Sequence, residues 1–219
     1  MTGDPDPRAV AASDALAHLR RVDPVLARLI ARHPDFDPRD WLTDLPPMAA
    51  FGALVFQIAG QQLSVAATRS ILERLGAAFG GRLPEPAELL ALDASTLRGT
   101  GLSGRKAETL RAVAAQFADG TLSDHSLRAL SDEEIEASLT TIAGIGPWTV
   151  HGMLIIAFDR PDVVLAGDLA LRKVIRRVYD LDRLPTQEDV LRIAEPWRPY
   201  RSLATAYLFG VEFETPAQP

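Results

Sequence analysis

Apolar residues recur at the three- and four-residue spacing of an α-helix along nearly the whole chain. One such stripe follows Asp23-Pro24, a typical helix start, and comprises Val25, Leu26, Leu29 and Ile30. The main β-branched run, within residues 161–166, is too short to found a sheet. The pattern therefore predicts an all-α protein with roughly ten to twelve helices.

Composition narrows the class of protein further. Apolar residues make up 47% of the 219 and charged residues 24%, which excludes wholesale disorder. Cysteine is absent, which excludes disulfide frameworks, Cys-ligated zinc, iron–sulfur clusters and thiol nucleophiles. The acidic, proline-broken start does not resemble a signal peptide, and the apolar run at 153–158 is too short to span a bilayer. We therefore expect a cytoplasmic protein with no membrane contact.

The distribution of positive charge matters more than the net charge of −6. An acidic balance argues against broad non-specific binding of nucleic acid, although local basic clusters can still bind it. Lys106 and Lys173 are the only lysines, so arginine supplies nearly all the positive charge. Arginine favours bidentate contact with phosphate, and the densest basic run begins at Arg172.

Two glycines separated by one residue, Gly144 and Gly146, lie between two predicted helices. Glycine permits positive φ and close approach of another backbone. Amides at the start of the second helix, with the helix dipole behind them, would suit an anion such as a phosphate. Taken alone, the pattern also fits an ordinary turn between two helices.

Asp168 follows Gly167 at the start of a later predicted helix. Aspartate is a favoured N-cap, worth about 1 kcal/mol, so this position alone predicts a cap. Asp168 gains a second interpretation from its place downstream of the glycine pair.

This order of a glycine hairpin, a helix, a loop and an aspartate resembles the helix-hairpin-helix (HhH-GPD) DNA glycosylase superfamily. The segments AGQQLSVA (59–66), GLSGRKA (101–107) and EPWRPYRS (195–202) resemble its 3-methyladenine DNA glycosylase II branch. The resemblance spans about residues 23–212. It implies two helical lobes flanking a DNA-binding cleft, without an N-terminal β domain.

The resemblance also implies a division of the chain. Residues 1–9 are expected to be a disordered tail. Residues 10–46 and 157–219 would form one lobe, and residues 47–156 the other. The helix-hairpin-helix, at about 131–158, would belong mainly to the second lobe.

The activity implied is that of a monofunctional glycosylase, a monomer that excises alkylated bases of the 3-methyladenine type from double-stranded DNA in base excision repair. Asp168 would stabilise the oxocarbenium-like transition state, with no cofactor needed for catalysis. In relatives that also cut the strand, a lysine occupies the position of Trp148. Lys173 lies about 140° around its helix from Asp168, so no AP lyase activity is expected.

The resemblance assigns further residues to the site. The wedge that fills the gap in the base stack would be Gln62 or Leu63. The base pocket would include Trp148, His151, Tyr200 and Phe209. DNA-backbone contacts would come from the Gly144 and Gly146 amides, the Thr149 hydroxyl and Arg172. Backbone carbonyls of Thr140, Ile142 and Ile145 would hold a structural Na⁺ or K⁺. Gly152 stands where the family has an aromatic residue and Phe209 where it has a tryptophan, which implies a roomier, less aromatic pocket.

Three other functions compete with this interpretation. One is a DNA-binding helix-hairpin-helix protein without catalysis, against which Asp168 argues. Another is a glycosylase for oxidised or mismatched bases, which the missing lysine and cysteines disfavour. A metal-dependent nuclease or deaminase is disfavoured because the four histidines are scattered and no H-x-E or C-x-x-C motif occurs.

Overall fold

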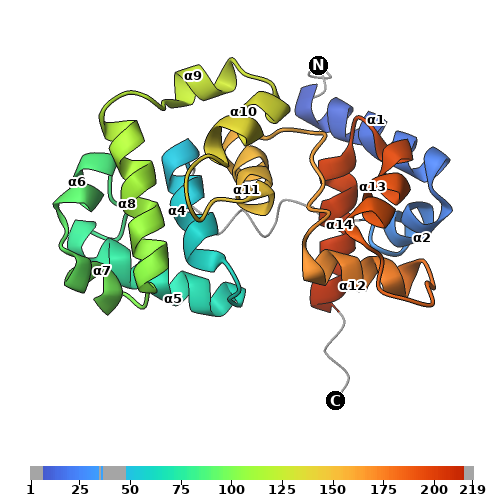
Figure 1. Cartoon of the computed structure of the whole chain (residues 1–219). Helices are drawn as coiled ribbons and strands as arrows, with labels where there is room; N and C mark the ends of the chain where they lie inside the picture. The colour runs from blue at the N-terminus through green and yellow to red at the C-terminus, as the bar shows by residue number, and fades with distance from the viewer. Residues whose placement is uncertain (1–6, 35, 37–47, 215–219) are drawn as a thin grey trace, which may run out of the picture. The chain divides into compact units, whose positions relative to one another are not determined.

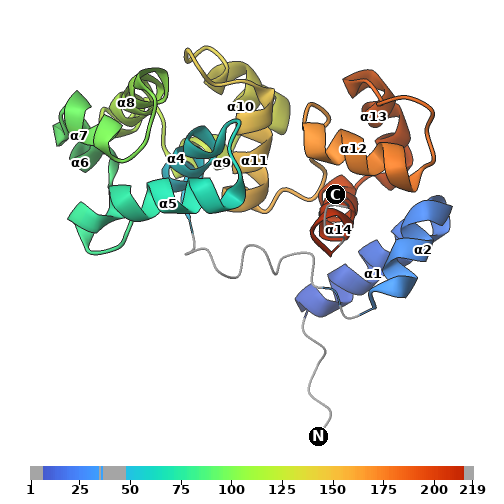
Figure 2. The ribbon, with the colours of Figure 1, turned by 90° about the horizontal axis from the view of Figure 1, so that it is seen from below.

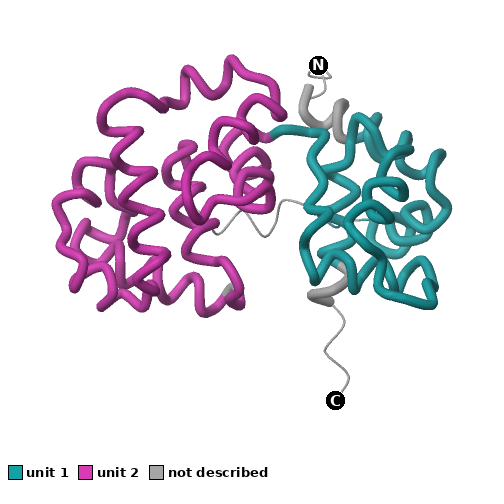
Figure 3. Tube along the Cα trace, viewed as in Figure 1, with its two compact units in different colours: residues 1–45, 160–219 teal, residues 46–159 magenta. Residues whose placement is uncertain are grey.

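The computed structural model describes residues 7–34, 36 and 48–214. The chain divides into two compact units, residues 1–45 with 160–219 and residues 46–159 (Figure 3). The first unit is therefore assembled from both ends of the chain, and the second is one continuous insertion. The sequence-based prediction put the boundaries after residues 46 and 156. The cleft expected between the lobes stays a prediction.

Helices supply the regular structure of the described residues, none of which lies in a strand. The all-α prediction is confirmed, and residues 161–166 form turns and irregular backbone. The predicted disordered tail, residues 1–9, overlaps the first helix, because α1 begins at Pro7. Residues 1–6 lie outside the described part of the chain. Within that part, no helix has both the length and the apolar character needed to cross a bilayer.

The unit formed by residues 46–159 is built around α4 (Ala50–Gly60). This helix is buried on almost every side because α5, α8 and α11 pack against it (Figures 1 and 2). An apolar helix without a polar face belongs in such a central position. The surrounding elements are α5 (Val65–Gly76), η1 (Ala77–Phe79), α6 (Pro86–Ala91), α7 (Ala94–Gly99), α8 (Gly104–Ala118), α9 (Asp124–Arg128), α10 (Asp132–Leu139) and α11 (Pro147–Phe158).

The start of α4 is capped from a distant part of the sequence. Ala49 stands at the N-cap and offers no side-chain acceptor. Asp124 supplies it instead, since its Oδ1 accepts a hydrogen bond from the Ala50 amide at 3.0 Å. Asp124 begins α9, a five-residue helix that the apolar spacing did not predict.

The other unit packs its helices around Trp197, which is fully buried. α14 is central to it and contacts both α2 and α12 (Figure 1). Core side chains come from both chain segments, which ties the N-terminal helices to the C-terminal third. The elements are α1 (Pro7–Val22), α2 (Pro24–Arg32), α12 (Leu169–Val178), α13 (Gln187–Ala194), η2 (Glu195–Trp197) and α14 (Arg201–Glu214).

Asp23 joins three parts of this unit through one buried carboxylate. Its Oδ1 caps α2 by accepting from the amides of Val25 at 2.8 Å and Leu26 at 3.1 Å. Its Oδ2 accepts from the Tyr179 hydroxyl at 2.6 Å and from Trp197 Nε1 at 2.8 Å. Burial, followed by this bond to Asp23, raises the pKa of Tyr179 far above its usual value. The network fixes the end of α12, the helix that begins with the candidate catalytic aspartate.

Candidate functional site

The glycine turn joins α10 to α11 in the unit of residues 46–159. Ser131 and Glu134 form a reciprocal capping box at the start of α10. The chain turns after Leu139, and α11 begins at Pro147, which has no N–H to leave unsatisfied. Within the described residues, the Gly144 and Gly146 amides donate no hydrogen bond to the protein. Together with the α11 dipole, these amides can bind an anion.

Gly144 is required by both conformation and space. Its φ of +92° lies in the region that favours glycine. A Cβ there would overlap Thr109 Oγ1, which itself donates to the Ala143 carbonyl at 3.0 Å. The turn is therefore held against α8 at a position where no side chain fits.

Thr149 lies in the first turn of α11, and its side chain is buried. It is only 2% exposed, and its hydroxyl accepts a hydrogen bond from Gln61 Nε2 at 3.0 Å. The same nitrogen donates to the Gly144 carbonyl at 3.0 Å. This hydroxyl helps hold the turn after α4 against the hairpin, and its contact with a phosphate stays a prediction.

The break after α4 presents two side chains to solvent. Gln62 is exposed and adopts a left-handed φ of 59°, and Leu63 is 44% exposed despite being apolar. Gln61, between them and the helix, is instead held against the hairpin. Gln62 and Leu63 are thus available for contact with a ligand, while the wedge role stays a prediction.

The predicted base-pocket residues divide between the two units. Trp148 and His151 lie on α11, where His151 Nε2 is 2.6 Å from Glu136 Oε2 of α10. Tyr200 makes an edge-on ring contact with His18, at 5.4 Å between centroids, and Phe209 packs on the core of the other unit. A single pocket formed by all four stays a prediction.

The extra room expected at Gly152 is filled. A Cβ at this position would overlap the side-chain amide of Gln57, which is 7% exposed and extends from α4. The space beside Gly152 is therefore taken by a buried amide, and the roomier, less aromatic pocket stays a prediction.

Asp168 forms the N-cap of α12, as predicted, with Oδ1 accepting from the Leu171 amide at 2.9 Å. Its own amide donates to the Leu165 carbonyl at 2.8 Å, which fixes the preceding turn. The side chain is half-buried, and the next residue, Leu169, is 52% exposed. The carboxylate is therefore held in one orientation at an accessible helix end.

The structure shows some of the contacts of Arg172 and of the hairpin carbonyls that were predicted to hold a cation. Arg172 Nε donates to the Pro185 carbonyl at 2.6 Å, so this part of its guanidinium supports the loop before α13. The Ile142 carbonyl accepts the turn bond from the Ile145 amide at 3.0 Å. Among the described residues, no group of three or more His, Cys, Asp or Glu side chains is arranged to hold a metal. A cation held by the Thr140, Ile142 and Ile145 carbonyls is a different kind of site and stays a prediction.

Sequence reasoning missed Gln61 and Lys106, which support the exposed turn. Lys106 Nζ donates to the carbonyls of Ala59 at 2.8 Å and Gln61 at 2.7 Å. The only sequence signals were the rarity of lysine and the resemblance of residues 101–107 to the family.

The helical fold of the described residues, the glycine hairpin and the capped aspartate define a helix-hairpin-helix protein of the DNA-repair type. The family model for "HhH-GPD superfamily base excision DNA repair protein" matches residues 55–199. The chain belongs to this family.

Related proteins agree with this assignment. DNA-3-methyladenine glycosylase 1 of Schizosaccharomyces pombe is 32% identical over 88% of this chain and 84% of its own length. YfjP of Bacillus subtilis, named as a DNA-3-methyladenine glycosylase, is 34% identical over 74% of this chain, which spans 58% of that protein. The structure of S. pombe Mag1, a 3-methyladenine DNA glycosylase in complex with abasic DNA, matches with a TM-score of 0.85. That match has 29% identity and covers 94% of this chain and all of that one.

Proposed function

We propose that this protein is a monofunctional DNA glycosylase that hydrolyses the N-glycosidic bond of alkylated bases of the 3-methyladenine type. The observation that carries the proposal is the carboxylate of Asp168, half-buried and oriented by its own helix cap. The names of the S. pombe and B. subtilis relatives support the substrate class.

Asp168 has the chemistry that this reaction needs. Alkylation of a ring nitrogen makes the base a good leaving group, so bond cleavage requires little protonation. Positive charge develops on the sugar, and a fixed carboxylate stabilises it or orients the attacking water. Because the cap already holds the side chain, no rearrangement of Asp168 is needed at the moment of reaction.

The two lysines support hydrolysis without strand cleavage. A lyase reaction needs an amine that can form a Schiff base with the sugar. Lys106 Nζ is engaged by two backbone carbonyls, and Lys173 lies about 140° around α12 from Asp168. Trp148 stands at the hairpin position where relatives that also cut the strand carry the lysine that forms the Schiff base.

Binding to double-stranded DNA forms part of the same proposal. The Gly144 and Gly146 amides would bind a backbone phosphate, and Gln62 or Leu63 would enter the gap left by the flipped base. We further propose a cytoplasmic monomer that needs no catalytic cofactor, with a structural Na⁺ or K⁺ at the hairpin carbonyls.

The direct test combines base release with trapping of a Schiff base. DNA treated with dimethyl sulfate is incubated with the protein, released bases are separated, and abasic sites are scored before and after alkali. We expect release of 3-methyladenine, strand breaks only after alkali, and no covalent adduct with borohydride. A borohydride adduct would contradict the monofunctional mechanism, and DNA binding without base release would favour a non-catalytic protein.

A further inference from the structure

Lys106 caps the end of α4 from a neighbouring helix. It lies in the first turn of α8, and its Nζ donates to the carbonyls of Ala59 at 2.8 Å and Gln61 at 2.7 Å. The last carbonyls of a helix carry partial negative charge, so a cation there is stabilising. Partial burial lowers the pKa of Lys106, which is the cost of holding the ammonium group against the helix end.

These carbonyls need an outside donor because the chain leaves the helix abruptly. The Leu63 amide would reach the Ala59 carbonyl in a continuing helix, but it donates instead to Gly60 at 3.0 Å. Gln62 then turns through a left-handed φ of 59°. Lys106 therefore bonds to the last turn of α4 and to the first residue of a strained turn whose exposed residues are Gln62 and Leu63.

A second set of bonds joins the same turn to the glycine hairpin. Gln61 Nε2 donates to Gly144 and Thr149, each at 3.0 Å. On α8, Thr109 lies one turn from Lys106, and its hydroxyl shares its proton between the Ala143 carbonyl of the hairpin and the Arg105 carbonyl of its own helix, each at 3.0 Å. The α8 helix, the wedge turn (residues 61–63) and the hairpin are thus connected pairwise by side-chain hydrogen bonds.

We propose that Lys106 is a positioning residue that fixes the wedge turn relative to the phosphate-binding hairpin. The inference rests on the proposed glycosylase function and deepens it. A wedge keeps a base out of the stack only if the turn that carries it does not move when it is pressed against the neighbouring bases. With the hairpin bound to a phosphate, the Lys106 and Gln61 bonds would set how far Gln62 and Leu63 enter the duplex.

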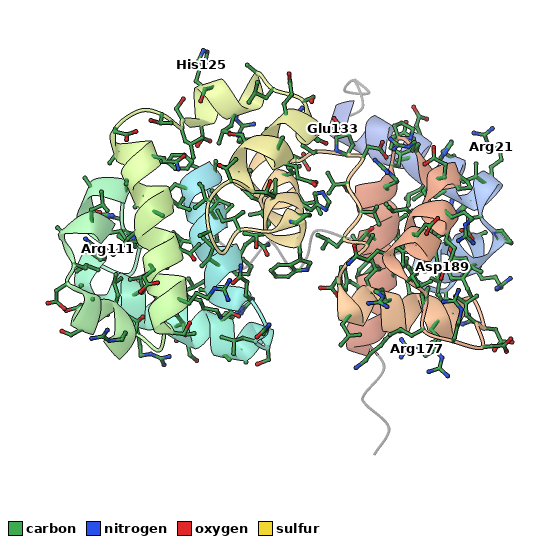
Figure 4. The ribbon with its side chains drawn as sticks, viewed as in Figure 1. Arg21, Arg111, His125, Glu133, Arg177 and Asp189 are labelled. Carbon is green, nitrogen blue, oxygen red and sulfur yellow. The ribbon has the colours of Figure 1, made fainter. Side chains whose placement is uncertain are left out.

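The rival explanation is that Lys106 only stabilises the fold, and α8 provides a matched control for it. Arg111, labelled in Figure 4, donates through Nη1 to the carbonyls of Leu90 at 3.2 Å and Leu92 at 2.7 Å, at the C-terminal end of α6. Arg111→Met therefore removes a cation from two carbonyls in the same unit, but it leaves the wedge turn untouched. Lys106→Met removes the equivalent bonds from the wedge turn.

The experiment compares the full-length wild type with both variants, after melting curves establish that each is folded. Binding is measured on a duplex that carries 2-aminopurine beside the damaged base, because its fluorescence rises on unstacking. Base release is measured in single turnover with saturating protein. For Lys106→Met we expect a reduced fluorescence rise and release slowed about ten- to a hundredfold, with affinity for undamaged duplex changed by no more than about twofold. Lys106→Arg should restore part of the rate.

Arg111→Met should match the wild type in both fluorescence and release. The inference is overturned if Lys106→Met behaves as the wild type, or if both variants lose the signals equally. If the wild type unstacks DNA but releases no base, the proposed hydrolysis fails and the fluorescence comparison alone decides the role of Lys106. If the wild type does not unstack DNA, the wedge inference fails as well.

Discussion

Gln57 and Gly152 share one space between α4 and α11. The glycine leaves room for the amide of Gln57, and a Cβ at residue 152 would overlap that amide. Glycine in the interior of a helix costs about 1 kcal/mol relative to alanine, so its presence in α11 needs such a compensation. Packing against Gln57 provides it.

We therefore predict that Gly152→Ala lowers the free energy of unfolding by about 1–2 kcal/mol, because overpacking outweighs the gain in helix propensity. In a Gln57→Ala background the same change should be neutral or stabilising. Urea unfolding of both single variants and the double variant gives the coupling. Equal effects of Gly152→Ala in the two backgrounds would show that the two residues do not compete for space.

The residues next to a position in the sequence were enough to predict the roles of some residues but not of others. The Asp168 cap and the glycine turn depend on neighbours in the sequence, so residue type and order were enough. Lys106 acts on carbonyls 45 and 47 residues away, and no sequence pattern marks a backbone carbonyl. The bond between Thr149 and Gln61 could not be predicted either, because the two residues are 88 positions apart in the sequence.

Capping residues fix where the helices begin, and the cap of α7 shows how the stability that a cap contributes depends on pH. Asp93 accepts from the Ser95 hydroxyl at 2.6 Å and from the Thr96 amide at 2.7 Å. These bonds, that from Ser95 first, lower the pKa of Asp93 to about 2. A carboxylate whose pKa is lower in the folded state stabilises the fold above its unfolded pKa, near 3.9, and loses this contribution as the pH falls toward 2.

Asp93→Asn keeps a capping oxygen but removes this titration. We predict that the wild type is more stable than this variant above about pH 5, and that the difference shrinks between pH 4 and pH 2. Chemical unfolding at a series of pH values measures it. A difference that stays constant down to pH 2 would mean that the charge of Asp93 makes no contribution.

The helices themselves were largely predictable, because apolar spacing and caps are properties of short segments. α9 was missed since five residues are too few to show a period. α8 begins at Gly104 because Ser103 is its cap, with the Ser103 side chain accepting from the Lys106 amide.

The hydrophobic core of one unit needs side chains from both ends of the chain. Leu26 and Ile30 of α2 share a buried core with Trp197 and Leu208. The unit of residues 46–159 instead draws its core from one continuous segment. The two units should therefore differ in their ability to fold alone.

We predict that a fragment of residues 46–159 shows helical circular dichroism and a cooperative unfolding transition. The fragment 160–219 should remain largely unfolded, because it lacks the core side chains of α1 and α2. Mixing it with a peptide of residues 1–45 should restore helicity. A cooperative transition of 160–219 by itself would contradict this dependence.

In the proposed mechanism Asp168 serves as both helix cap and catalytic carboxylate. The most direct measurement is single-turnover release of 3-methyladenine by the wild type and by Asp168→Asn. Asparagine caps helices about as well as aspartate, so the variant should keep its melting temperature and its affinity for DNA. We predict that it loses release by at least a hundredfold, on the order of the loss when one charge-stabilising group is removed from an active site. Equal release by the two proteins would remove Asp168 from the chemistry and contradict the account.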